Sequence, residues 1–222
     1  MNNMKMWKNT RKTTPRKDPF GTFEHLIDMN ERTFQAQHAH RLEDPERLKW
    51  LPPAEVISSL QLHPGMAVAD IGAGTGYFSL PIAEAVGEEG KVFAVDFQQE
   101  MLGHIRQKLQ REGLPPNIEL LLGDATATTL PGQSVDLVFL ANVWHELDDH
   151  AAVLVEAKRV LRPNGRIAIL DWRPDVVQPP GPPLAHRIAP DAVGTTVQKE
   201  GWKVDSTRNA GSYSYLVKAS TS

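Results

Sequence analysis

The stretch Val68-Ala69-Asp70-Ile71-Gly72-Ala73-Gly74-Thr75-Gly76 decides how this chain folds. Residues 66–71 are apolar except for Asp70, which predicts a short buried strand with one acid near its end. Three glycines at alternating positions follow, and the apolar residues of 77–86 have helical spacing. A strand, a glycine turn and a helix predict a ligand site at the carboxyl edge of a sheet, where we expect backbone amides to face the ligand.

The glycine spacing argues against a pyrophosphate ligand. Dinucleotide-binding loops follow the pattern G-x-G-x-x-G. Here the third glycine is Gly76, and Tyr77 stands where the dinucleotide pattern has its third glycine. A smaller, phosphate-free group therefore fits this loop better, although the glycine run alone leaves other nucleotide-binding Rossmann proteins open.

The composition is that of an ordinary globular protein. Its 222 residues predict one domain with a sizeable core. The absence of cysteine excludes disulfides, thiolate metal sites and cysteine nucleophiles. No apolar run approaches the roughly 20 residues that span a bilayer, and the N-terminus lacks the apolar core of a signal peptide. We therefore expect no membrane span and a cytoplasmic location.

The charge is divided unevenly along the chain. Residues 1–17 contain lysines and arginines but no acid, whereas the whole chain has a formal charge of −3. We interpret residues 1–19 as a disordered basic tail, with contact to nucleic acid or membrane as the alternative. The acidic remainder argues against a nucleic-acid substrate, because neutralising phosphates requires a basic face.

Residues 20–52 are predicted to form a helical cap ahead of the main domain, residues 53–222. Phe23, Leu26, Ile27 and Phe34 have helical spacing, which predicts an amphipathic helix over 20–40. His38 and His40 follow at its end. Because helical residues two apart point in different directions, we predict no metal site there.

Strand and helix patterns alternate through the rest of the chain. The predicted helix over 149–161 has Asp148 as its N-cap. Five β/α repeats specify a doubly wound parallel sheet, and 202–207 with 212–218 predict a terminal antiparallel pair. The remaining predicted strands cover residues 91–95, 118–122, 135–140 and 166–170.

Acidic residues follow the second and third predicted strands. Asp96 ends the second strand, where a carboxylate can accept hydrogen bonds from both hydroxyls of a ribose; the alternative is a helix cap. Phe97 and Met101 follow where an adenine can lie against apolar side chains. Asp124, after the third strand, can accept from an exocyclic amine such as adenine N6.

These motifs together resemble the class I S-adenosylmethionine (SAM)-dependent methyltransferases. The resemblance covers residues 50–218 and is closest to the small-molecule enzymes of ubiquinone and menaquinone biosynthesis. It rests on Asp70 with its glycines, Asp96, Gly123-Asp124, residues 142–146 and residues 161–165. It implies a Rossmann-like α/β fold with a seven-stranded sheet in the order 3-2-1-4-5-7-6, strand 7 antiparallel, and an N-terminal helical lid.

The resemblance also implies a SAM site and S-adenosylhomocysteine (SAH) as the product. The glycine loop would hold the methionine part, Asp96 the ribose and Asp124-Ala125 the adenine, with Asn142-Val143 beside the sulfonium. The implied cofactor-binding residues are Asp70, Gly72, Ala73, Gly74, Gly76, Asp96, Phe97, Met101, Asp124, Ala125, Asn142 and Val143.

Methyl transfer from a sulfonium depends mainly on positioning and exclusion of water, and a base is needed only where the acceptor loses a proton. His145, after the fourth strand, is the first candidate base; alternatively it holds its loop by bonding a backbone carbonyl. Asp171, ending the fifth strand, is the second candidate or a cap. His186, beyond a proline-rich loop, is the third.

We therefore expect an enzyme that transfers methyl from SAM to a small or medium-sized acceptor, as a monomer or homodimer and without a metal. Two alternatives stay open. One is a protein or nucleic-acid methyltransferase, and the other is a non-catalytic SAM-binding module that regulates a partner.

Overall fold

The computed structural model describes residues 33–112, 117–176 and 180–221, and its centre is one seven-stranded sheet. The strand order is β3-β2-β1-β4-β5-β7-β6. Strands β1 to β5 are parallel, and β7 pairs antiparallel with both β5 and β6, so the predicted order and direction are confirmed. The strands are β1 (Ala67–Ile71), β2 (Lys91–Asp96), β3 (Ile118–Leu122), β4 (Val135–Ala141), β5 (Leu161–Trp172), β6 (Trp202–Ala210) and β7 (Ser214–Thr221).

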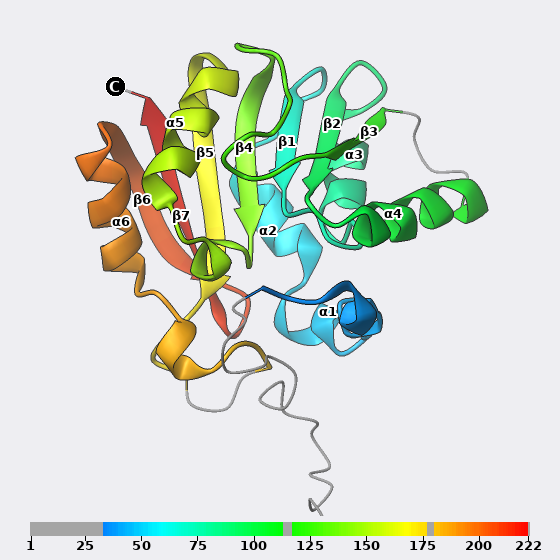
Figure 1. Cartoon of the computed structure of the whole chain (residues 1–222), viewed down its shortest axis with the longest axis horizontal. Coiled ribbons are helices and arrows are strands. Elements are labelled where there is room, and N and C mark those ends of the chain that lie inside the picture. Colours follow the sequence, from blue (N-terminus) through cyan, green and yellow to red (C-terminus); the bar gives the residue numbers. More distant parts are fainter. Residues whose placement is uncertain (1–32, 113–116, 177–179, 222) are drawn as a thin grey trace, which may run out of the picture.

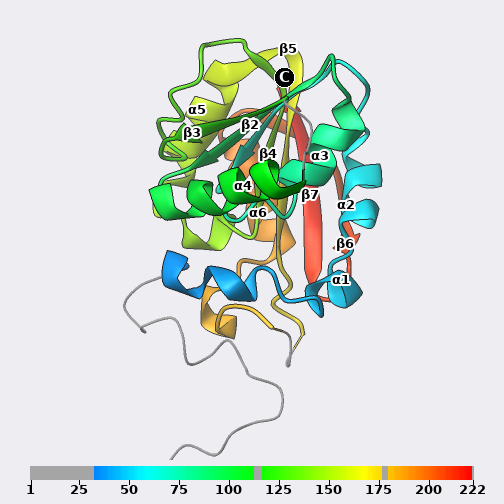
Figure 2. The same ribbon diagram turned by 90° about the vertical axis from the view of Figure 1, so that its right-hand side faces the viewer.

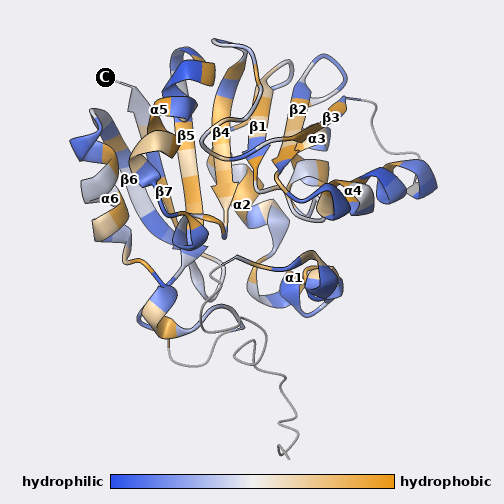
Figure 3. Cartoon of the chain, in the orientation of Figure 1, coloured by the Kyte–Doolittle hydropathy of each residue, from blue (hydrophilic) through white to orange (hydrophobic). Residues whose placement is uncertain are grey.

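Helices cover both faces of the sheet (Figure 1). Helices α2 and α3 pack on one face, where Val92 of β2 contacts them. Helix α4 packs against Ala94, which lies two residues after Val92 and therefore points to the same face of the sheet. Helices α5 and α6 pack on the other face. Apolar residues follow the central strands, whereas the outer sides of the helices are polar (Figure 3). The α-helices are α1 (Arg47–Trp50), α2 (Pro53–Leu60), α3 (Ser79–Val86), α4 (Gln99–Glu112), α5 (His150–Val160) and α6 (Pro190–Lys199).

Several predicted element ends differ from the structure, and two of them have a local explanation. Asp149, not Asp148, is the N-cap of α5, since its carboxylate accepts the amide of Ala152 at 2.9 Å. Strand β5 begins at Leu161, five residues before the predicted strand. Residues 162–165 bulge out of its pairing with β4, and Asn164 has a φ of 67°, so the residues between the predicted helix and the predicted strand lie inside β5.

The N-terminal segment 33–51 lies across the carboxyl ends of the central strands, and two perpendicular views agree on this (Figures 1 and 2). The predicted tail 1–19 and most of the helix predicted over 20–40 lie outside the described residues. Where the segment is described, the prediction of an α-helix is wrong. Gln35 is extended, with φ −85° and ψ 134°, and only a 3-10 helix, η2 (Ala36–Arg41), follows. The Gln98 side chain replaces helical bonding here, accepting from the Ala36 amide and donating to the Phe34 carbonyl.

The turn between β6 and β7 is hydrogen-bonded to the end of this segment. The amide of Ser212 donates to the Trp50 carbonyl at 2.8 Å, and the amide of Gly211 donates to Glu55 at 3.0 Å. Gly211 has a φ of 61°, and a Cβ there would overlap the Trp50 carbonyl oxygen. The absence of a side chain at this position therefore fixes where Trp50 lies.

We expect Gly211→Ala to lower the free energy of unfolding by about 1–3 kcal/mol, because alanine is strained at positive φ and displaces the Trp50 backbone. Thermal unfolding measures the effect. Gly103→Ala is the matched control: Gly103 lies within α4 with open space around its Cβ position, so alanine should stabilise the helix. Equal melting temperatures for the two variants would contradict the assigned role of Gly211.

Candidate functional site

A cavity of about 420 Å³ lies at the carboxyl ends of β1 and β4, where the strand order reverses. Open α/β sheets bind ligands at this reversal, and the volume is within the range of small-molecule sites. Its floor comes from the strand ends and the glycine loop. Its walls come from segment 33–51, from residues 142–149 and from Trp172 with Gly181 and Pro182.

The glycine loop leaves room for a ligand but does not offer the row of free amides that its sequence predicts. The amides of Gly72 and Ala73 donate to the Val95 carbonyl at 2.8 and 3.0 Å. The amide of Gly74 donates to Asp96 at 2.9 Å, and that of Gly76 to the Ala73 carbonyl. The expectation of bare amides is therefore wrong at these four positions, because the end of β2 takes three of them. This pattern agrees with a ligand part that carries no phosphate.

Asp70 is a buried acid at the end of β1. It is 2% exposed, and one of its oxygens accepts the hydroxyl of Ser79 at 2.5 Å. Burial raises the pKa of Asp70 to about 7, opposed by the Ser79 hydrogen bond and by the nearby Arg47 charge. A cationic ligand group beside this carboxyl would bind its ionised form.

Asp96 ends β2 and reaches back over the glycine loop. Its carboxylate accepts the amides of Gly74 and Gln98, each at 2.9 Å. Burial raises its pKa despite these bonds. A carboxylate offers about four lone-pair sites, so Asp96 can still accept two ligand hydroxyls. Phe97 beside it lines the cavity with its side chain 55% exposed, an apolar surface left open next to the floor.

Two buried polar atoms on the cavity wall are placed to bind a ligand. The side-chain oxygens of Thr75 and Asn142 are both buried without a hydrogen-bond partner within the described chain, and both residues line the cavity. Buried polar groups are rarely left unpaired in native proteins. Asn142 also has a φ of 59°, a left-handed conformation at the end of β4. These atoms, with the space above Gly72 and Gly74, fit a ligand of SAM's kind: compact, polar and free of phosphate.

The opposite part of the floor holds the residues predicted for adenine. Met101, Asp124 and Ala125 all line the cavity, as does Val143. One oxygen of Asp124 accepts from the amide and hydroxyl of Thr126 at 2.8 and 2.6 Å, which orients the carboxylate. The structure thus brings together every predicted cofactor-binding residue except Gly76. A Cβ at Gly76 would press on Ile105 of α4, so this glycine serves helix packing.

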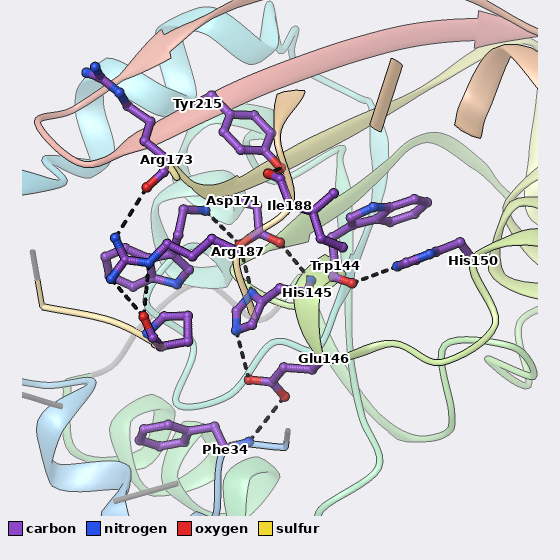
Figure 4. A network of polar contacts seen from close by, with 12 residues as sticks. Phe34, Trp144, His145, Glu146, His150, Asp171, Arg173, Arg187, Ile188 and Tyr215 are labelled. Atoms are coloured by element: carbon purple, nitrogen blue, oxygen red, sulfur yellow. Dashed lines mark hydrogen bonds and ion pairs between the residues drawn. The ribbon is translucent and has the colours of Figure 1, made fainter. Parts of the chain in front are cut away.

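His145 and Asp171 form a buried pair beside this floor (Figure 4). Asp171 accepts the backbone amide of His145 with one oxygen and the Nδ1 atom of its imidazole with the other, both at 2.8 Å. Because a carboxylate only accepts hydrogen bonds, Nδ1 carries the proton and Nε2 is the basic nitrogen of the neutral ring. Burial disfavours the imidazolium, but the charge and hydrogen bond of Asp171 outweigh it and raise the pKa of His145.

Glu146 completes the group and ties it to the N-terminal segment. One of its oxygens lies 3.8 Å from Nε2 of His145, and the other accepts the Phe34 amide at 3.2 Å. Burial raises the pKa of Glu146 to about 7, opposed by His145 and by the Phe34 amide. Both His145 and Glu146 line the cavity, whereas Asp171 lies behind them, fully buried.

Aromatic side chains wall the rest of the cavity. The rings of Trp50 and Trp172 lie 5.4 Å apart, and both line it. Arg187 holds the adjoining loop by donating to the carbonyls of Pro182 and Arg173. Gly181 packs so closely on the Trp172 ring that a Cβ would overlap it. This side of the cavity suits a flat, partly apolar molecule.

Three predicted histidines lie outside the cavity. His186 ends the 3-10 helix η4 (Leu184–His186) and does not line the cavity. His38 stacks edge-on with the Phe34 ring, and His40 is exposed. Within the residues that the structure describes, no group of three His, Asp or Glu side chains is placed to hold a metal ion.

Several cavity residues were missed from the sequence. They are Leu42, Arg47, Trp50, Thr75 and Gln98. Most belong to the segment that crosses the sheet edge, where helical spacing gives no hint of a ligand. Arg47 belongs to the run Asp44-Pro45-Glu46-Arg47, which reads only as the start of a helix.

Comparison with known proteins identifies the fold and family. A family model described as a methyltransferase domain matches residues 68–165. A SAM-dependent methyltransferase of Aquifex aeolicus has a solved structure that superposes with a TM-score of 0.81 and 33% identity, covering 86% of this chain and all of that one (100%).

Curated relatives match over a smaller share of their length. The ubiquinone/menaquinone biosynthesis C-methyltransferase UbiE of Shewanella piezotolerans is 28% identical over 73% of this chain and 62% of its own length. The demethylmenaquinone methyltransferase of Geobacillus stearothermophilus is 34% identical over 56% of this chain and 52% of its own length. The chain thus spans about half to three-fifths of these relatives. None of the described helices is long and apolar enough to cross a membrane.

Proposed function

Since the chain belongs to the class I SAM-dependent methyltransferases, we propose that it transfers a methyl group from SAM to a small, partly apolar acceptor, with His145 as the base. The observation that carries this proposal is a single cavity lined by the glycine loop, by Asp96 and by the buried His145. A non-catalytic binding module would need the first two features but not the third.

The floor of the cavity would hold the cofactor. Asp96 would accept the ribose hydroxyls, and Asp124 with Ala125 would receive the adenine against Phe97 and Met101. Asp70, Gly72–Gly74 and Asn142-Val143 would surround the methionine part and the sulfonium. When bound, SAM supplies an electrophilic methyl group whose C–S bond breaks toward sulfur and leaves SAH.

The residues of this chain would then position the acceptor and take its proton. Nε2 of His145 would accept the proton as the acceptor atom attacks the methyl carbon, so the positive charge lost from the sulfonium ends on the imidazolium. Asp171 is a positioning residue: it fixes the tautomer through Nδ1 and stabilises the imidazolium that forms. Glu146 adds a second carboxylate at 3.8 Å from Nε2, which favours the same charged state.

The part of the cavity beside His145 and the aromatic wall, here called the acceptor half, has the lining expected for a small substrate. Trp50, Trp172 and Phe34 line it with aromatic side chains, and segment 33–51 lies across the carboxyl ends of the central strands (Figures 1 and 2). The curated relatives are named for quinone biosynthesis, which agrees with a flat acceptor carrying an acidic O–H or C–H. Residues 33–51 would exclude water from the reacting atoms. A cytoplasmic location completes the proposal.

Methyl transfer from labelled SAM into fractionated cell extract tests the proposal. We expect label in the small-molecule fraction with wild-type protein and none with His145→Ala. Label that enters only protein or nucleic acid would refute the small acceptor. Binding of SAM without any transfer would favour the regulatory module instead.

The affinity for SAM should rise with pH between pH 5.5 and 7.5. Asp70 has a pKa of about 7 without ligand, so at lower pH it is neutral and must lose its proton to pair with the ammonium group. Below that pKa, affinity gains up to about tenfold per pH unit and binding releases a proton. Calorimetry in two buffers of different ionisation enthalpy measures both effects.

Variants separate Asp70 from Glu146, the other cavity carboxyl whose pKa burial raises to about 7. Asp70→Asn should bind SAM weakly and with little pH dependence. Glu146→Gln removes the other carboxyl of pKa about 7 and should keep the wild-type slope. A slope that disappears in Glu146→Gln instead would assign the effect to the wrong residue.

A further inference from the structure

Arg47 is a buried cation with few partners. It is 6% exposed, and its guanidinium donates a single hydrogen bond within the described chain, from Nη1 to the Leu42 carbonyl at 3.2 Å. Its Nε–H is buried without a partner. The group lies 3.8 Å over the ring of Tyr77, whose hydroxyl donates to the Leu51 carbonyl at 2.6 Å. Burial of a charge is costly unless the charge is paired and hydrogen-bonded.

No carboxylate of the described chain compensates this charge at ion-pair distance. Burial lowers the pKa of Arg47 to about 10, and Glu43 and Asp70 are close enough to raise it in part. Glu43 is engaged elsewhere, because it pairs with Lys108 at 2.7 Å. Asp70 bonds Ser79 instead. Arg47 therefore remains charged at neutral pH, and within the described residues its guanidinium makes one hydrogen bond while its Nε–H makes none.

Arg47 and Asp70 line the same cavity beside the glycine loop. One carries a positive charge, and the other becomes negative near neutral pH. Opposite charges that share a cavity wall without pairing to each other are complementary to a zwitterion. The α-amino acid end of a ligand is such a group, with its carboxylate and ammonium on one carbon.

We propose that Arg47 is the receptor for the α-carboxylate of the methionine end of SAM, opposite Asp70 at the ammonium. This inference rests on the proposed function. An arginine suits this role, because its guanidinium presents two N–H donors in a fixed fork that matches the two oxygens of a carboxylate. The Tyr77 ring and the Leu42 carbonyl hold the fork in place, so little side-chain freedom is lost on binding.

With this assignment, segment 33–51 would contact the cofactor as well as the acceptor. Arg47 is the first residue of α1, and Tyr77 follows the glycine loop on the way to α3. A carboxylate bound at Arg47 would bridge these two parts of the chain. Cofactor binding would therefore fasten the segment that also carries Phe34 and Trp50 over the acceptor.

Calorimetry with three ligands tests the proposal on full-length protein. SAH has the whole amino acid end, decarboxylated SAH lacks only the carboxylate, and 5′-methylthioadenosine lacks the entire end. Wild type should prefer SAH to decarboxylated SAH by about 10- to 100-fold, the strength of hydrogen bonds to a charged group. Arg47→Gln should lose that preference and still bind methylthioadenosine within about twofold of wild type, as should Arg106→Gln, an exposed control on α4.

Thermal unfolding supplies an independent readout. Because the ligand-free protein buries Arg47 without compensation, Arg47→Gln should melt at the same temperature as wild type or higher, but gain much less from added SAH. Equal loss of affinity for SAH and methylthioadenosine, or a preference for SAH that survives in Arg47→Gln, would overturn the proposal. Failure of wild type to bind any of the three ligands would instead refute the proposed function itself.

Discussion

His145→Ala is expected to slow methyl transfer by about 10²- to 10⁴-fold, the usual contribution of a positioned general base. Nε2 of His145 is the basic atom that the cavity offers to the acceptor, since Asp171 holds the other ring nitrogen at 2.8 Å. The affinity for SAH should not change, because the imidazole belongs to the acceptor half. Single-turnover transfer of labelled methyl, with calorimetry on the same samples, measures both quantities.

Two further variants make this result specific. His150→Ala is the matched control: His150 stacks on Trp144 at 4.2 Å and bonds its carbonyl, but lies outside the cavity. It should lower stability and leave the rate unchanged. Asp171→Asn should slow transfer as well, because an amide can impose the wrong tautomer on His145. Full turnover by His145→Ala and Asp171→Asn would require that base catalysis by this pair be abandoned.

Asp96→Ala should weaken SAH binding by about 100-fold or more, the loss of two charge-assisted hydrogen bonds to ribose hydroxyls. Asp96 also accepts the Gly74 amide, so a disordered glycine loop is the competing explanation. An SAH analogue without ribose hydroxyls separates the two. Wild type should bind the analogue as weakly as Asp96→Ala binds SAH, and the variant should lose little further affinity for it.

Asp136→Ala is the control for the backbone contact. Asp136 accepts the amide of Ala67 at 2.8 Å, much as Asp96 accepts that of Gly74, but it pairs with Arg162 and does not line the cavity. It should destabilise the protein and leave SAH affinity intact. If Asp136→Ala weakened SAH binding as much as Asp96→Ala, the ribose assignment would be wrong.

The sheet could be predicted because its signals are local. Short apolar strand patterns that alternate with helical patterns predicted all seven strands, and the family resemblance implied their order. The bulge at residues 162–165 was missed, because only pairing with β4 places these residues inside β5. The wrong cap, Asp148 for Asp149, is a one-residue uncertainty between two adjacent acids.

The cofactor half of the site could be predicted because its residues follow strand ends directly. The pairing of His145 with Asp171 needed one more step: β4 and β5 are parallel neighbours, with Ala141 opposite Leu170, so the residues after each strand meet. Arg47 could not be found this way. The spacing of apolar residues does not predict that an arginine is buried. The position of Arg47 in the cavity depends on how segment 33–51 packs across the sheet.

Calorimetric titration of the purified chain with SAM, SAH, NAD and ATP decides which cofactor the cavity binds. SAM and SAH should each bind at one site per chain, and neither NAD nor ATP should compete, because the amides of Gly72, Ala73, Gly74 and Gly76 are engaged within the protein and are not free to bind a phosphate. Absence of binding by both SAM and SAH, or equal binding of NAD, would contradict the assignment of this cavity to SAM.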